Sequence, residues 1–151
     1  MSYVQEVLQP GEKILFVSTI HWLIYAPGVA LIVVALVLTL SGMNSASAFL
    51  WQTAAFFVLL AALFSLIGAW FKRWTTEIAV TDRRVIYKRG FIRRRTIEMN
   101  MEKVESVDVS QSIPGRIFNY GDVLIRGVGV GFEPLRMVDD PIQLRNAVTA
   151  K

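Results

Sequence analysis

The sequence predicts a membrane α-helical hairpin plus an all-β or α+β domain, a small antiparallel barrel or sandwich capped by a C-terminal helix. Three observations support this fold class. Residues 22–71 contain no Asp, Glu, Lys or Arg, although charged residues make up 19% of the chain. Short runs rich in β-branched residues follow this segment, and the chain closes with an apolar helical pattern behind Asp-Asp-Pro. A soluble core would not exclude charge from so long a stretch, which indicates a membrane protein.

Two apolar runs within this segment are long enough to cross a bilayer. They are residues 22–40 and 49–71, and at about 1.5 Å per residue each can span a hydrocarbon core of roughly 30 Å. The uncharged linker between them, residues 41–48, is so short that the two helices must be antiparallel neighbours. Aromatic residues of the kind that form interfacial belts stand at the ends of the runs: Trp22, Tyr25, Trp70, Phe71 and Trp74.

Positive charge predicts the orientation of the hairpin. Lys13 precedes the first run, Lys72 and Arg73 follow the second, and the linker has no basic residue. The positive-inside rule therefore places both termini in the cytoplasm, which predicts a multi-pass protein of the cell (inner) membrane. A cleaved signal peptide is the alternative, but the first apolar run is longer than usual and Glu6 and Glu12 precede it.

Small residues recur every seven positions in the second run and predict a helix-packing face. The residues expected on that face are Ala54, Ala61, Ser65, Gly68 and Ala69. Such a stripe allows a close, left-handed helix crossing. The face would either pack against the first run, through Ala26, Ala30 or Ala35, or support homo-oligomerisation, and the short linker favours the first alternative.

The residues after the hairpin predict short antiparallel strands and two helical segments. Expected strands are 76–81, 83–89, 94–100, 104–111, 123–128 and 134–138, and residues 11–18 could add one from before the hairpin. Val107 and Val109 should share a face opposite Ser106 and Asp108. A short helical turn is expected around residues 115–119. The closing helix should begin near Pro141, with Ile142, Leu144, Ala147 and Val148 on its buried face.

This pattern resembles the bacterial pleckstrin-homology-like membrane proteins, a family with a two-helix hairpin before the domain. The similarity covers roughly residues 8–149 and rests on these residues: Thr81, Arg84, Gly90, Arg93–Arg95, Val104, Val107, Gln111, Gly115, Arg116, Tyr120, Gly121 and Gly127. The resemblance implies a pleckstrin-homology (PH) type barrel capped by a helix. It implies no chemistry, because fold alone is a thin warrant for function.

The segment 81–96 concentrates seven of the sixteen basic residues and is the main candidate for a binding site. Its expected anion-binding residues are Lys88, Arg89, Arg93, Arg94 and Arg95. Clustered ammonium and guanidinium groups suit a phosphate, and an inner leaflet attracts nearby basic residues. The alternative is that these residues solvate an exposed strand face, prevent edge-to-edge pairing and form ion pairs with Glu98, Glu102 or Glu105.

Other sites have little support in the sequence. "GVGVGF" (127–132) lacks the spacing of a phosphate-binding loop and is read as a hairpin turn. The acids among residues 98–108 have no histidine nearby, and the chain has no cysteine and one histidine, His21, so neither a metal site nor a catalytic constellation is expected. Aromatic residues for stacking bases are sparse, so no nucleic-acid partner is expected.

These observations predict a non-enzymatic module without a cofactor. Its parts should be a cytoplasmic N-terminal segment (1–20), a transmembrane hairpin (21–71) and a cytoplasmic PH-like domain (72–151). We expect the domain to dock membrane proteins or copies of itself. The alternative function is a sensor of anionic phospholipid headgroups through the basic hairpin.

Overall fold

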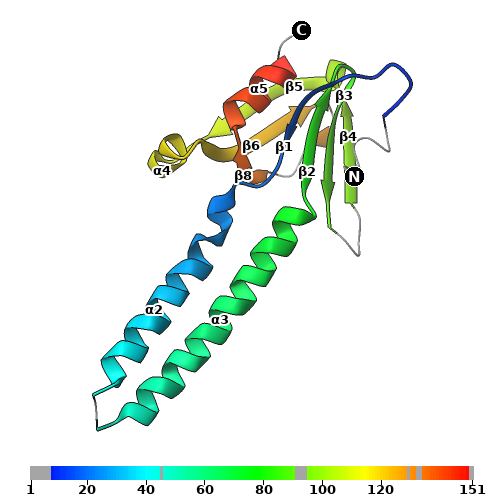
Figure 1. The fold of residues 1–151 in the computed structure, drawn as a ribbon. Helices are drawn as coiled ribbons and strands as arrows, with labels where there is room; N and C mark the ends of the chain where they lie inside the picture. Colours follow the sequence, from blue (N-terminus) through cyan, green and yellow to red (C-terminus); the bar gives the residue numbers. More distant parts are fainter. Residues whose placement is uncertain (1–7, 45, 91–94, 129, 132–133, 150–151) are drawn as a thin grey trace. The chain divides into compact units, whose positions relative to one another are not determined.

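The computed structural model describes residues 8–44, 46–90, 95–128, 130–131 and 134–149. The chain forms two compact units. One comprises Met1–His21 and Arg73–Lys151, and the other comprises Trp22–Lys72. The described strands all belong to the first unit, and the two long apolar helices make up the second (Figure 1).

The strand-containing unit is interrupted in sequence by the helical unit. β1 (Ile14–Ser18) precedes the long helices, yet it pairs antiparallel with β2 (Glu77–Thr81), which follows them. Figure 1 shows these two strands side by side. The expectation of a hairpin followed by a separate domain is therefore corrected, because the hairpin is inserted between neighbouring strands of one sheet. The expected strand within residues 11–18 is confirmed.

Eight described strands form two antiparallel sheets. The first sheet has the order β1-β2-β3-β4, in which β3 is Arg84–Arg89 and β4 is Arg95–Asn100. In the second sheet, β6 (Tyr120–Gly127) pairs with three strands: β5 (Val104–Ser110), β7 (Val130–Gly131) and β8 (Leu135–Asp139). The predicted strands are therefore present near their expected bounds.

The hydrophobic core joins both sheets to the C-terminal helix α5 (Pro141–Thr149). Its buried members are Ile78, Val80, Val85, Tyr87, Met99, Val123, Ile125, Leu135, Val138, Leu144 and Val148. In β5, Val107 and Val109 pack against this core while Ser106 and Asp108 are exposed, which confirms the predicted alternation. Ile142 is 44% exposed, so its predicted place on the buried face of α5 is wrong.

Two short helices connect strands of the domain. The 3-10 helix η2 (Met101–Lys103) links β4 to β5, and α4 (Ile113–Ile117) links β5 to β6. The expected helical turn between the fourth and fifth predicted strands is therefore confirmed. Ser112 caps α4, because its side-chain oxygen accepts a hydrogen bond from the Gly115 backbone N–H at 3.2 Å.

The helical unit contains η1 (Trp22–Tyr25), α2 (Ala26–Gly42) and α3 (Ala48–Trp74). Together, η1 and α2 form a continuous apolar stretch of 21 residues, and α3 has 27 residues. Both helices are long and apolar enough to cross a membrane. Pro27 lies in the first turn of α2, where its missing N–H is tolerated.

Candidate functional site

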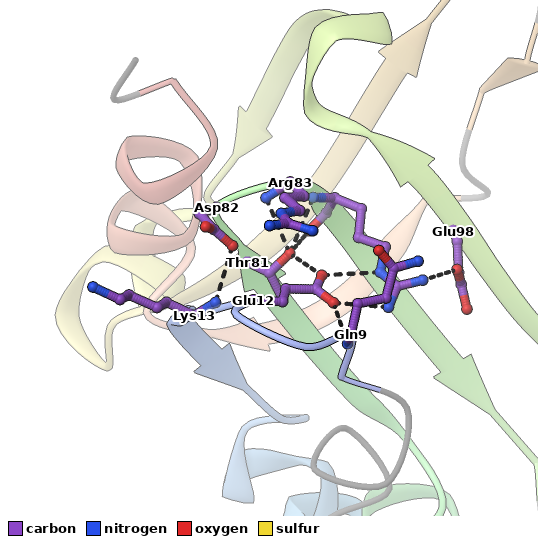
Figure 2. A network of polar contacts seen from close by, with 8 residues as sticks. Gln9, Glu12, Lys13, Thr81, Asp82, Arg83 and Glu98 are labelled. Carbon is purple, nitrogen blue, oxygen red and sulfur yellow. Dashed lines mark hydrogen bonds and ion pairs between the residues drawn. The ribbon is translucent and has the colours of Figure 1, made fainter.

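A network of polar contacts joins the segment before β1 to the turn between β2 and β3 (Figure 2). The guanidinium of Arg84 donates from Nε to Glu12 Oε1 at 2.9 Å and from Nη2 to Oε2 at 2.8 Å. This two-point contact matches the planar fork of arginine to the carboxylate. The third guanidinium nitrogen, Nη1, donates to Glu98 Oε2 on β4 at 2.7 Å.

Further donors complete the environment of the Glu12 carboxylate. The Thr81 hydroxyl donates to Oε1 at 2.7 Å, and the Gln9 backbone N–H donates to Oε2 at 2.9 Å. Next to this cluster, the Lys13 backbone N–H donates to Asp82 Oδ1 at 3.0 Å, and the Asp82 N–H donates to the Lys13 carbonyl at 3.1 Å. The segment before β1 is thus held to the β2–β3 turn by side-chain and backbone hydrogen bonds.

Burial makes the charge pair at the centre of this cluster strong. The Glu12 side chain is fully buried, and the Arg84 side chain is 12% exposed. Hydrogen bonding to Arg84 lowers the pKa of Glu12 to about 2, against the desolvation that acts in the opposite direction. The same bond raises the pKa of Arg84. Both groups are therefore charged at neutral pH.

This cluster, which we call the Glu12 clamp (Gln9, Glu12, Thr81, Arg84 and Glu98), is structural in character. Both carboxylate oxygens of Glu12 already accept hydrogen bonds from protein donors, so the group is poorly placed to bind a ligand. It could not be predicted from the sequence. Its two charges are 72 positions apart, and no local pattern links them.

The basic hairpin predicted to bind anions is described only in part. Lys88 is half-buried and Arg89 is exposed, and Arg89 is the register partner of Arg95 across β3 and β4. Gly90 at the end of β3 has a φ of 90°, which favours glycine at that turn. Arg93 and Arg94 lie outside the described residues. Arg84, another basic residue of the segment 81–96, forms an ion pair with Glu98, one of the acids named in the ion-pairing alternative. It also pairs with Glu12, which that alternative did not include.

A groove lies beside β4, which ends the first sheet. Within the described part of the chain, β4 pairs on one side only, with β3. The groove has a volume of about 200 Å³, and its lining residues are Ile97, Glu98, Met99, Asn100, Lys103, Gly127 and Val128. It combines an apolar wall with backbone groups at a strand edge, which is the chemistry that accepts an added extended segment.

Small residues form the packing face of the helical unit, and of the five predicted positions only Ala69 is buried. Ala55, Ala62 and Ala69 of α3 are buried, whereas Ala54, Ala61 and Gly68 are exposed and Ser65 is half-buried. On α2 the buried residues are Gly28, Ala35 and Gly42 rather than the expected Ala26 and Ala30. Both buried sets repeat every seven residues, as in a left-handed antiparallel pair.

Close contacts explain why glycine occupies two of these positions. A Cβ atom at Gly28 would lie 2.5 Å from Leu66 Cδ2, and one at Gly42 would lie 2.4 Å from Trp51 Cβ. The Gln52 side chain also reaches α2, where its Nε2 donates to the Thr39 carbonyl at 3.5 Å. The face of α3 that contains Ala62 therefore packs within the hairpin.

The remaining candidate sites gain no support from the geometry. Among the described residues, no group of three or more His, Asp or Glu side chains could hold a metal ion. Asp108 forms an exposed ion pair with Arg126 at 3.2 Å. In the glycine-rich segment, Val130 and Gly131 form β7 and pair back onto the end of β6, while residues 129, 132 and 133 are outside the described part.

The fold defines a class of protein: a small two-sheet domain capped by a C-terminal helix and interrupted by two long apolar helices. The family model described as bacterial PH domain matches residues 14–151. The chain therefore belongs to the bacterial PH domain family, which confirms the resemblance seen in the sequence. The matched region begins at β1, before the long helices, in agreement with the split domain. No curated protein and no solved structure matches the chain in the same comparisons.

Proposed function

We propose that this protein is a membrane-anchored, non-enzymatic binding module whose PH domain docks other membrane proteins or copies of itself. Among the described residues, one edge of β4 has no partner strand, and this edge with its adjoining groove is the observation that carries the proposal. Domains of this family suggest a binding role rather than catalysis. The most tightly bonded charged cluster, the Glu12 clamp, is occupied by internal hydrogen bonds and thus serves stability.

The anchoring part of the proposal rests on the two apolar helices. The outward side chains of α2 and α3 include many large apolar residues, such as Phe49 at 81% and Phe64 at 73% exposure. Exposure of these apolar surfaces to water is unfavourable, whereas contact with lipid tails is not. Lys72 and Arg73 at the end of α3, and all basic residues of the domain, favour a cytoplasmic domain with both termini inside an inner membrane.

The docking part follows from strand chemistry. An extended segment of a partner can add to β4 by backbone hydrogen bonds, while the groove accepts alternate side chains. Ile97 and Met99 supply apolar contact in the groove, and Val128 stands at its rim with 65% of its surface exposed. Residues of β4 and the turn after β6 should therefore approach the partner most closely.

Site-specific photo-crosslinking of the intact protein in its membrane tests this proposal. We place a photoreactive amino acid at Val128 and, as a matched control, at the exposed Gln143 on α5. The proposal predicts a covalent adduct with a second copy or another membrane protein from position 128 and none from position 143. Recovery of uncrosslinked monomer from both variants would contradict docking at the β4 edge.

One observation favours a second function, attraction to anionic lipid headgroups. Arg89 and Arg95 are register partners across β3 and β4, so the strand pairing brings two basic positions together. In the sequence, Lys88, Arg93 and Arg94 stand close to these two positions, and basic residues concentrated in this way attract anionic headgroups.

Hydrogen exchange of the intact protein in vesicles tests the lipid function. A fragment beginning at residue 72 would lack β1 and Glu12, so the whole chain is required. Anionic lipid should slow amide exchange in residues 84–100, and about 1 M salt should remove the effect, because the Debye length is then roughly 3 Å. Replacement of Lys88 and Arg89 by Gln should also weaken it. Exchange that is independent of lipid charge would exclude this function.

A further inference from the structure

The short helix α4 displays its large apolar side chains to solvent instead of burying them. Ile113 is 78% exposed, Ile117 is 73% exposed, and Phe118 directly after the helix is 46% exposed. Among the described residues of the split domain, the two isoleucines are the most exposed large apolar side chains. Their exposure equals that of outward residues on the apolar helices, such as Phe64 at 73%. A clustered apolar surface of this kind marks an interaction site.

This orientation of α4 is built into the domain by specific contacts. Gly115 faces inward, where a Cβ atom would lie 2.6 Å from the Tyr120 carbonyl oxygen. The Gln111 side-chain amide donates to that same carbonyl at 3.1 Å, and Ser112 caps the helix. Because the glycine side of α4 is pressed against the start of β6, Ile113 and Ile117 must point away from the domain. Figure 1 shows α4 (yellow) projecting from the edge of the domain.

The chain leaves the domain for the first apolar helix close to α4. His21, the last residue of the domain before this exit, stacks on Tyr120 with 5.2 Å between ring centroids. Its backbone N–H donates to the Met137 carbonyl at 2.8 Å, so the exit point is held firmly. Tyr120 is three residues after Ile117, which places the backbone of Ile117 within roughly 11 Å of that of Tyr120, the residue on which His21 stacks. Trp22, the next residue in the chain, already belongs to η1.

We propose that α4 and Phe118 insert into the lipid interface of the bilayer that the hairpin spans, an inference that rests on the membrane anchoring proposed above. The tether at His21 keeps this apolar surface at high effective concentration next to lipid, which favours lipid over a diffusing protein as its occupant. Arg116 is exposed on the same helix, and α4 contains no acid. A basic residue among apolar ones is typical of interfacial segments, since its charge can remain at the headgroups.

Acidic groups near the exit do not oppose this arrangement. Asp139 is half-buried, and its carboxylate lies 3.9 Å from Nε2 of His21. Asp140 accepts a hydrogen bond from the Asn119 side-chain amide. Asp140 is thus engaged by a neighbour within the domain, and neither acid belongs to α4.

Lipid-dependent quenching of a fluorophore tests the insertion. The chain has no cysteine, so an Ile117→Cys variant can be labelled at one position with an environment-sensitive dye. The control is Glu102→Cys, an exposed site in η2 at the other end of the β5–β6 ladder, roughly 20 Å away. In vesicles with spin-labelled lipid, quenching at position 117 should be at least about twofold stronger than at position 102. Replacement of Ile113 and Phe118 by Ser in the labelled protein should remove this difference.

Any quenching result other than the expected one contradicts the insertion of α4. A separate measurement distinguishes this failure from a failure of the anchoring proposal. Equal quenching at positions 117 and 102 would show that α4 is in water. A blue-shifted dye at position 117 without lipid quenching would show that protein covers α4. Alkaline extraction of the same vesicles reports on anchoring independently. If the protein is extracted, the anchoring proposal fails, whereas protein that resists extraction but shows no difference in quenching refutes only the insertion of α4.

Discussion

Replacement of Glu12 by Gln tests whether the segment before the transmembrane hairpin contributes to the free energy of unfolding of the PH domain. The substitution preserves the shape of the side chain but removes the charge that faces the guanidinium of Arg84. Arg84 would retain its ion pair with Glu98, whose side chain is 37% exposed. A guanidinium that is only 12% exposed would then be poorly compensated.

The expected loss of stability can be estimated from the pKa of Glu12. The value falls from 4.5 to about 2 in the folded protein. At 1.36 kcal/mol per pKa unit, this difference corresponds to about 3 kcal/mol in the free energy of unfolding at neutral pH. Loss of one partner from a buried ion pair has a similar size, roughly 3–5 kcal/mol. We therefore expect Glu12→Gln to destabilise the domain by about 3 kcal/mol.

The pH dependence has a definite sign. Because the pKa of Glu12 is lower in the folded than in the unfolded state, its stabilisation is complete above about pH 5.5. It is lost as the pH falls through 4.5 towards 2, where the folded carboxylate is protonated. The difference in stability between the wild type and Glu12→Gln should therefore shrink across this window.

Urea unfolding of the detergent-solubilised protein, read by pulse-labelling hydrogen exchange of β1 and β2 amides, measures these differences. The labelling pulse is given at one fixed pH, so only the equilibration pH varies. Glu98→Gln is the matched control, and its more exposed carboxylate should contribute no more than about 1 kcal/mol. The reasoning is refuted if Glu12→Gln costs no more than this control. A wild type and variant that lose stability in parallel below pH 5 would refute it as well.

Three further substitutions test other contacts. Thr81→Val removes the hydroxyl that donates to the buried Glu12 carboxylate, and in the same urea assay it should cost about 1–3 kcal/mol. Ala62→Leu overfills the fully buried position on α3 and should destabilise the helical hairpin by about 1–3 kcal/mol, measured by tryptophan fluorescence during detergent denaturation. Gly121→Ala would place a Cβ atom 2.8 Å from the Ser110 carbonyl oxygen, so amide protection of β5 and β6 should fall.

Matched controls separate these effects from general sensitivity to substitution. Ala61→Leu alters the exposed neighbour of Ala62 and should leave the detergent midpoint almost unchanged. Gly68→Ala adds a Cβ atom that meets nothing within 4 Å and should be neutral or stabilising by up to about 1 kcal/mol. If Ala61→Leu were as harmful as Ala62→Leu, the assignment of the packing face would be incorrect.

Much of the fold could be predicted because its signals are local. Exclusion of charge from residues 22–71 indicates the hairpin, and alternation such as that of Val107 and Val109 indicates strands. Adjacent small residues recur every seven positions in α3, as Ala54-Ala55, Ala61-Ala62 and Gly68-Ala69, and this spacing predicted the packing period of the helix. They did not reveal which member of each pair faces α2, because adjacent residues on a helix share the same seven-residue period and differ only in direction.

By itself, the sequence determined the two apolar helices, the strands that follow them and the C-terminal helix. Each of these elements follows from a pattern of apolar and polar residues that are close together in the chain. Only the tertiary structure decided that β1 completes a sheet across the hairpin. It also decided that Arg84, one of the seven basic residues of segment 81–96, is paired with Glu12. Strand partners and buried ion pairs depend on distances in space between residues far apart in sequence, and no local periodicity encodes them.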